Sequence, residues 1–252
     1  MTETILEVKD LTKIYDDRPV VDGISFNVKK GEVFGILGPN GAGKTTTLEM
    51  IETMRPIDGG SITICGLDVA SQPQEVKAVI GVQPQTAAFQ DKQKLHEIIE
   101  MFAAAYGEKV NPWEFLEDVQ LGEKAGAYAE SLSGGQRQRL SIATALVHSP
   151  KVFFLDEPTT GLDPQARRNL WDLIREVNAR GVTVILTTHY LDEAELLCDR
   201  VAIMDKGKII AMDTPKTLIK QLLDKGFKKE QHVEQANLED VFIDLTGKGL
   251  RD

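Results

Sequence analysis

The stretch GPNGAGKTTT, Gly38 to Thr47, follows the short apolar run from Val33 to Leu37 and precedes a helical pattern. It fits the phosphate-binding motif G-x-x-x-x-G-K-[ST], in which glycines let the backbone wrap phosphate oxygens. Lys44 would place its charge on the β- and γ-phosphates, Thr45 would offer its hydroxyl to Mg²⁺, and the helix would direct its positive end at the anion. The strand-to-helix context favours this interpretation over a tight turn that carries a lysine by chance.

The second half of the chain predicts a parallel sheet. Two continuous apolar runs, Val152 to Leu155 and Val182 to Leu186, are typical of strands that are covered on both faces. Between them, GLDPQARRNLWDLIREVNARG predicts a helix with Asp163 as its cap, Pro164 in the first turn and Gly181 as its stop. Strand, helix and strand in this order imply a right-handed crossover and an α/β fold.

The remaining patterns divide the chain into regions. The first third is rich in strand patterns, at residues 5–11, 24–28, 33–37, 61–64 and 79–82. From about Leu95 to Val147 the apolar residues are spaced three and four apart, which predicts an inserted helical subdomain. Short strands at 200–204 and 208–211 lead to a helical tail. We therefore predict a nucleotide-binding core with a β subdomain at 1–85 and 150–220, a helical subdomain at 86–149, and a tail at 221–252.

Two adjacent acids, Asp156 and Glu157, lie at the carboxyl end of a predicted buried strand, where open α/β sheets bind ligands. Successive strand residues face opposite ways, so both acids can serve one site only if the strand ends there. Pro158 would end it and would favour an extended backbone at Glu157. Asp156 would then hold Mg²⁺, and Glu157 would orient and deprotonate the attacking water. The alternative is a pair of capping acids at the start of a loop.

Three other side chains are candidates for the same site. His189 ends the second apolar strand and could donate a hydrogen bond to a γ-phosphate. Gln85 lies between a strand and the helical insertion and could touch Mg²⁺ or the water, although the spacing leaves Gln83 open as a competing choice. Tyr15 is predicted to be a loop aromatic that could stack on a base. A lone histidine or loop aromatic is more often structural.

A second glycine-rich segment, SLSGGQRQRLS, spans Ser131 to Ser141 and opens another polar helix. Its backbone N–H groups could cradle an anion. It contains no lysine, and the chain already has one phosphate loop. The residues of this segment alone do not explain why a second anion-binding loop is present.

Composition narrows the class of protein. The chain has 252 residues, 42% hydrophobic and 27% charged, which are ordinary globular values. The formal net charge of -10 argues against binding nucleic acid or anionic lipid through the overall field. Cys65 and Cys198 lack metal-ligand spacing, which predicts reduced core thiols in a cytosolic protein. No signal peptide is recognisable and no apolar run approaches ~18 residues, so we expect any action on a membrane to require a partner.

These motifs, in this order, resemble the nucleotide-binding subunits of the ABC transporter family over nearly the whole chain. The matching pieces are GPNGAGKTT, the Gln85 loop, LSGGQ, the LDE that ends at Glu157, GLD and the switch histidine His189. The resemblance implies an α/β fold with a P-loop NTPase (RecA-like) core, a small antiparallel β subdomain and an inserted α-helical subdomain. It also implies ATP and Mg²⁺ as ligands.

The resemblance assigns a role to each matching residue. Glu157 would be the general base, with His189 on the γ-phosphate and Gln85 on the water, and Mg²⁺ would be held by Thr45, Gln85 and Asp156. LSGGQ would close on a nucleotide held by a partner subunit, whose own Lys44 makes a second lysine unnecessary. The implied nucleotide contacts are Tyr15, Gly38, Asn40, Gly41, Ala42, Gly43, Lys44, Thr45, Thr46, Asp163 and, from the partner, Ser133, Gly134, Gly135 and Gln136.

The ending NLEDVFIDLTGKGLRD is similar to that of the exporter branch, whose members move drugs, antibiotics, lipids or polysaccharides through a separate membrane subunit. The implied protein is an ATPase that works as a dimer with a second ATP-binding subunit, on the cytoplasmic face of the cell membrane. A polytopic permease would be its partner, with no nucleic acid. A docking site for that permease could lie beside Gln85, at Ala87, Ala88, Phe89, Met101 and Phe102, unless the phenylalanines are core. An importer ATPase, or a soluble ABC-type ATPase acting on nucleic acid or ribosomes, is the alternative.

Overall fold

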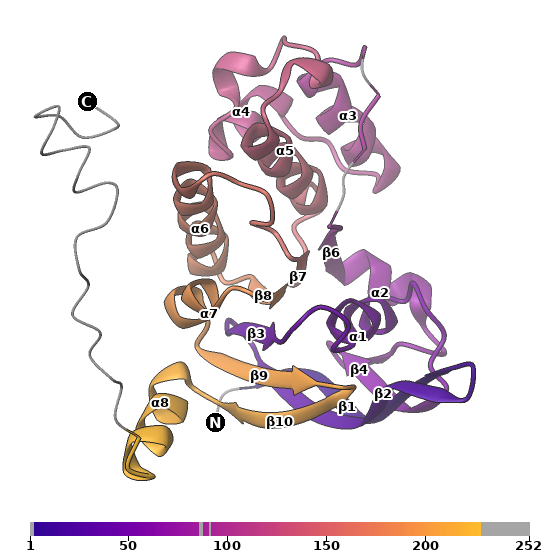
Figure 1. Cartoon of the computed structure of the whole chain (residues 1–252). Coiled ribbons are helices and arrows are strands. Elements are labelled where there is room, and N and C mark those ends of the chain that lie inside the picture. Colours follow the sequence, from indigo (N-terminus) through magenta and orange to yellow (C-terminus); the bar gives the residue numbers. More distant parts are fainter. Residues whose placement is uncertain (1–2, 86–87, 91, 228–252) are drawn as a thin grey trace, which may run out of the picture. The chain divides into compact units, whose positions relative to one another are not determined.

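The computed structural model describes residues 3–85, 88–90 and 92–227 (Figure 1). Its contacts divide the chain into one unit at Met1–Leu218 and a second at Ile219–Asp252. The last helix, α8 (Pro215–Asp224), begins in the first unit, and residues 228–252, which carry the exporter-like ending, lie outside the described residues. In the part of the chain that the structure describes, no helix has the length and apolar character needed to span a membrane.

A six-stranded sheet forms the centre of the first unit, in the order β10-β9-β3-β8-β7-β6. Its parallel strands are β3 (Val33–Leu37), β6 (Ile80–Gln83), β7 (Val152–Asp156), β8 (Thr183–Thr188) and β9 (Arg200–Asp205). The edge strand β10 (Lys208–Asp213) pairs antiparallel with β9. This arrangement confirms the predicted α/β fold.

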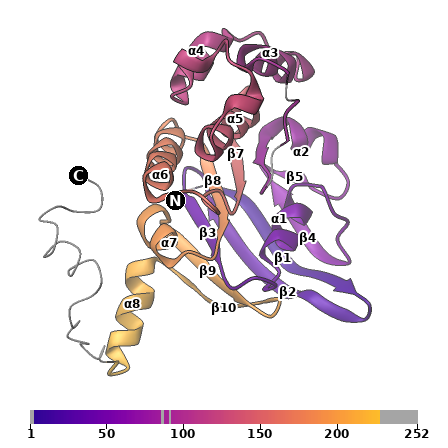
Figure 2. The ribbon, with the colours of Figure 1, turned by 45° about the horizontal axis from the view of Figure 1, so that its top comes forward.

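The central strands are buried on both faces, which is why their sequences are continuously apolar. Along β3, Phe34 and Ile36 pack into one hydrophobic cluster while Val33 and Leu37 pack into another. The first cluster includes residues of a second sheet and of α1 (Lys44–Ile51), and the other includes α5 (Gly134–Leu146) and α6 (Pro164–Ala179). Helices α5 and α6 lie side by side (Figures 1 and 2).

The second sheet has four strands, in the order β2-β1-β4-β5, and its pairs are antiparallel. Its strands are β1 (Thr4–Tyr15), β2 (Arg18–Lys29), β4 (Gly59–Ile64) and β5 (Leu67–Asp68). Tyr15 is the last residue of β1 and pairs with Arg18, so its prediction as a loop residue is wrong. The reason is a two-residue turn in which Asp16 and Asp17 both have positive φ, a geometry that lets strand pairing continue to the hairpin tip.

Between β6 and β7 the chain is helical, as predicted. The segment contains α3 (Leu95–Ala105), α4 (Pro112–Asp118), two short 3₁₀ turns at Gly122–Lys124 and Ala129–Ser131, and α5. Outside it, α2 (Pro73–Val79) precedes β6 and α7 (Leu191–Leu197) follows β8. The exact subdomain boundaries stay predictions.

Candidate functional site

The loop between β3 and α1 is shaped by close backbone packing. A Cβ at Gly38 would lie 2.2 Å from the carbonyl oxygen of Met204, and one at Gly43 would lie 2.6 Å from that of Val20. Gly43 is also the N-cap of α1, with φ of 101°. Only glycine fits these positions without a shift of the backbone.

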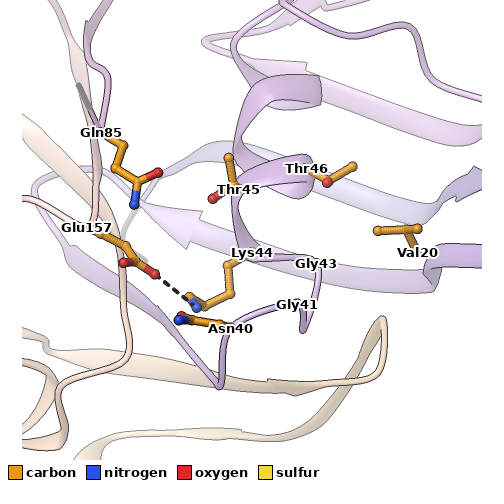
Figure 3. A pocket seen from close by; sticks show the side chains of 9 residues that line it. All are labelled: Val20, Asn40, Gly41, Gly43, Lys44, Thr45, Thr46, Gln85 and Glu157. Atoms are coloured by element: carbon orange, nitrogen blue, oxygen red, sulfur yellow. Dashed lines mark ion pairs between the residues drawn. The ribbon is translucent and has the colours of Figure 1, made fainter. Parts of the chain in front are cut away.

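Lys44 points into the hollow of this loop and is 4% exposed. Its Nζ donates to the carbonyl oxygens of Gly38 (2.9 Å) and Pro39 (3.2 Å) and lies 3.2 Å from Glu157 Oε1. The hollow has a volume of about 280 Å³ (Figure 3). It is lined by Val20, Asn40, Gly41, Gly43, Lys44, Thr45, Thr46, Gln85 and Glu157.

Oxygen atoms suited to Mg²⁺ meet at the edge of this pocket. The hydroxyls of Thr45 and Thr187 both donate to Asp156 Oδ1, at 3.2 and 2.5 Å. Burial raises the pKa of Asp156, and these two hydrogen bonds oppose part of the rise. Mg²⁺ prefers hydroxyl and carboxylate oxygens and would stabilise the charged form, so the residues present fit this ion.

The structure distinguishes the two candidate glutamines. Gln85 lines the pocket together with Thr45 and Glu157, and its amide faces the same space (Figure 3). Gln83 is fully buried and donates to the carbonyl oxygen of Pro84. Of the two, only Gln85 can reach a ligand in the pocket.

Glu157 follows the last residue of β7 and turns its carboxylate toward Lys44. Its φ of +46° contradicts the predicted extended backbone. The cause is the neighbouring strand, because the Glu157 N–H lies 3.0 Å from Thr187 Oγ1 and 3.2 Å from the Thr187 carbonyl oxygen and donates to both. Burial would raise the pKa of Glu157, but contacts with Lys44 and His189 outweigh it and hold the pKa below its ordinary value. The carboxylate is therefore ionised at neutral pH.

His189 follows β8, and its Nδ1 lies 3.1 Å from Glu157 Oε2. An ionised carboxylate only accepts, so Nδ1 must carry the proton. In the neutral ring Nε2 is then an acceptor. Donation from Nε2 to a phosphate, as predicted, requires either the protonated ring or release of Glu157.

Other predicted residues do not line this pocket. The Tyr15 hydroxyl accepts from Arg55 Nη1 at 2.7 Å. Ser133 and Gln136 form a reciprocal capping box at the start of α5, with Gly134 and Gly135 in the first turn. Asp163 caps α6 by accepting from Gln165 N and Ala166 N, each at 2.9 Å. Their contacts with nucleotide stay predictions.

Two residues of the site were not predicted from the sequence. Val20 lines the pocket from β2, and no local pattern marks it. Thr187 holds both Asp156 and the backbone of Glu157. Its position near the carboxyl end of β8 could have indicated it, because ligands bind at that edge of a parallel sheet.

Comparisons with known proteins show which family the chain resembles. The family described as ABC transporter matches residues 21–160. The linearmycin resistance ATP-binding protein LnrL of Bacillus subtilis (strain 168) is 41% identical over 223 residues, which cover 86% of this chain and 72% of that protein. The Nod factor export ATP-binding protein I of Burkholderia pseudomallei (strain 1710b) is 44% identical over 224 residues, covering 87% and 74%.

Solved structures share the fold. An ATP-binding cassette of an ABC transporter in its ADP conformation has a TM-score of 0.80 at 27% identity, covering 88% of this chain and 96% of that one. An ATP-binding subunit of an ABC transporter has a TM-score of 0.78 at 30% identity, covering 96% and 99%. The resemblance seen in the motifs is thus confirmed, and the chain belongs to the ABC transporter family as one of its ATP-binding subunits.

Proposed function

We propose that this chain hydrolyses ATP at the pocket beside Lys44, with Glu157 as the general base, and so drives an exporter. The observation that carries the proposal is the contact of one carboxylate, which lines the phosphate-loop pocket, with both Lys44 Nζ (3.2 Å) and His189 Nδ1 (3.1 Å). A base needs an ionised form within reach of the attacking water. The lowered pKa of Glu157 supports that ionised form.

The same contacts describe what ATP would change. Lys44 is held by two loop carbonyls and by Glu157, and phosphate oxygens would compete for this ammonium group. Once Lys44 turns to the phosphates, Glu157 is free to accept a proton from water. Thr45 and Asp156, with Gln85, would hold Mg²⁺, which would neutralise phosphate charge.

Replacing Glu157 tests this role. Glu157→Gln should lower turnover about 10²- to 10⁴-fold, because the amide cannot accept the proton. ATP binding should persist, since the phosphate loop is unchanged. The measurements are phosphate release and titration with ATP, with Glu195→Gln, an exposed position on α7, as the matched control. Full turnover in Glu157→Gln would show that Glu157 is not the general base.

The second glycine-rich loop supports a dimer in which each subunit completes the other's site. Ser133 and Gly134 are exposed at the start of α5, and the N–H groups of Gly134 and Gly135, which the capping box does not use, can bind an anion. No described residue crowds Gly134, since its nearest possible Cβ contact among them is Leu162 at 3.9 Å. Phosphates held by a second subunit would approach Gly134 closely from outside. That approach would explain why this position is a glycine.

Export and a permease partner are inferred from relatives and from the surface. The two relatives described above are named for Nod factor export and for linearmycin resistance. A groove of about 270 Å³ borders β6 and the helical segment, and Met54, Phe102 and Tyr106 contribute to its lining. Phe89 and Phe102 also pack on the core, and Ala87 lies outside the described residues. We place the docking of a membrane subunit at this groove, which would hold the chain at the cytoplasmic face.

A further inference from the structure

A stack of three side chains leads from α6 to the proposed base. The guanidinium carbon of Arg167 lies 4.4 Å from the centre of the Tyr190 ring. The Tyr190 ring centre lies 4.2 Å from that of His189, with the planes tilted by 39°. His189 in turn contacts Glu157 through Nδ1. Arg167 is therefore connected to Glu157 through two rings, without touching the pocket itself.

The contacts of Arg167 indicate that the ring fixes its position. Its Nε is buried and has no hydrogen-bond partner among the described residues. Its Nη1 lies 3.6 Å from Asp192 Oδ2, which is a long contact with an exposed carboxylate. A buried N–H without an acceptor is costly, and the ion pair with Asp192 is long, so polar contacts do not explain the placement. The face of the Tyr190 ring attracts the guanidinium cation and so explains where Arg167 lies.

The same turn of α6 contacts the second glycine-rich loop. A Cβ at Gly135 would lie 3.0 Å from the Cβ of Ala166, the residue before Arg167. The start of α5 and the first turn of α6 are thus packed together, and a shift of one displaces the other.

We propose that Arg167 is a positioning residue, which holds Tyr190 against His189 and thereby connects the start of α5 to the orientation of His189 and Glu157. The proposal rests on the proposed function, because it acts through Glu157 and His189. Arg167 makes no contact with ATP in this proposal. Its loss should change the rate of hydrolysis more than the binding of substrate.

Steady-state kinetics on the full chain test the stack. Arg167→Met keeps the aliphatic stem and removes the charge, and Tyr190→Leu removes the ring. Each should lower kcat roughly tenfold, because a misplaced catalytic group loses rate, while KM for ATP stays within about twofold. The double variant should be no worse than either single one, because both break the same stack. Arg167→Lys should recover part of the rate, since an ammonium also binds a ring face.

The controls separate the stack from other roles. Arg168→Met, at an exposed neighbour, and Asp192→Asn, which weakens only the ion pair, should both keep wild-type kcat. The proposal is wrong if Arg167→Met keeps wild-type kcat, if Asp192→Asn reproduces the loss, or if the two losses multiply in the double variant. If Arg167→Met does not fold, Tyr190→Leu against Tyr190→Phe decides, and equal kcat in those two overturns the proposal. Full turnover in Glu157→Gln instead defeats the proposed function itself.

Discussion

The two glycine-rich loops both precede a helix, yet they differ in whether the neighbouring residues require glycine. Before α1, a side chain at Gly38 or Gly43 would collide with backbone oxygens at 2.2 and 2.6 Å, and Gly43 has φ of 101°. Before α5, Gly134 has its nearest neighbour at 3.9 Å, and neither it nor Gly135 has a positive φ. The first loop needs glycine for its own packing, and Gly134 in the second does not.

The two loops also differ in the charge that their own side chains supply. The first loop is filled by its own buried Lys44, whereas α5 starts with a neutral capping box between Ser133 and Gln136. An anion that binds the first loop meets the ammonium group of a lysine from the same chain. An anion at the second loop would meet only backbone N–H groups and a hydroxyl. The comparison teaches that the first loop carries its own cation, whereas the second depends on another chain to bring a charged ligand to it.

The largest effect is expected from two variants, each of which disables one of the two loops. Lys44→Ala should abolish a subunit's own site, and Ser133→Arg should abolish only the site it lends, each lowering turnover by about 10²-fold or more. In a freely exchanging mixture about half the dimers contain one chain of each kind, so about a quarter of all sites should be whole. ATP trapping and ATP-dependent dimerisation measure this recovery.

The matched control for that mixture is Ser131→Arg, at an exposed position two residues before Ser133. It should leave turnover near wild type, because Ser131 lies outside the capping box. Normal hydrolysis by Ser133→Arg alone would show that the second loop has no role toward a partner.

A smaller effect, on stability, is expected when Gly43 and Gly134 are each replaced by alanine. Gly43→Ala should lower the free energy of unfolding by about 3 kcal/mol or more, because the methyl group meets the Val20 carbonyl in a backbone conformation that favours glycine. Gly134→Ala should change it by less than about 0.5 kcal/mol. Urea unfolding measures both, and equal losses would contradict the contrast.

The smallest effect concerns the far end of α1. Glu52 is buried there, with Oε1 lacking a partner among the described residues, and burial, then Asp156 and Glu49, raise its pKa to about 8. The folded state therefore holds a proton that the unfolded state loses near the ordinary glutamate pKa of 4.5. The stability from this proton is complete below that value and is lost as the pH rises to about 8.

Glu52→Gln should remove this dependence. Relative to the variant, the wild-type chain should lose on the order of 1 to 3 kcal/mol of unfolding free energy between about pH 5 and pH 8. Urea unfolding at the two pH values measures it, and Glu195→Gln is the exposed control. A difference between wild type and Glu52→Gln that does not vary with pH would show that Glu52 titrates normally.

Much of the fold could be predicted because the signals are local. The continuous apolar runs of β7 and β8 and the capped helix between them determine a parallel pair, and β3 with GPNGAGKTT determines a strand, loop and helix. The short helix α2 and the hairpin tip at Asp16 and Asp17 were missed. A seven-residue helix has little periodicity to detect, and a turn of two aspartates lacks the usual glycine.

The sequence by itself determined the phosphate loop, the family and the residue types at the strand ends, because a spacing of glycines, a lysine and a hydroxyl already specifies the chemistry. Tertiary structure decided which side chains meet. Thr187, from the neighbouring strand, holds the backbone of Glu157 at positive φ against the preference that Pro158 imposes. Gln83 is buried and cannot reach a ligand in the pocket, which leaves Gln85 as the glutamine of the site. Such outcomes depend on contacts between residues distant in the chain, and no local pattern carries them.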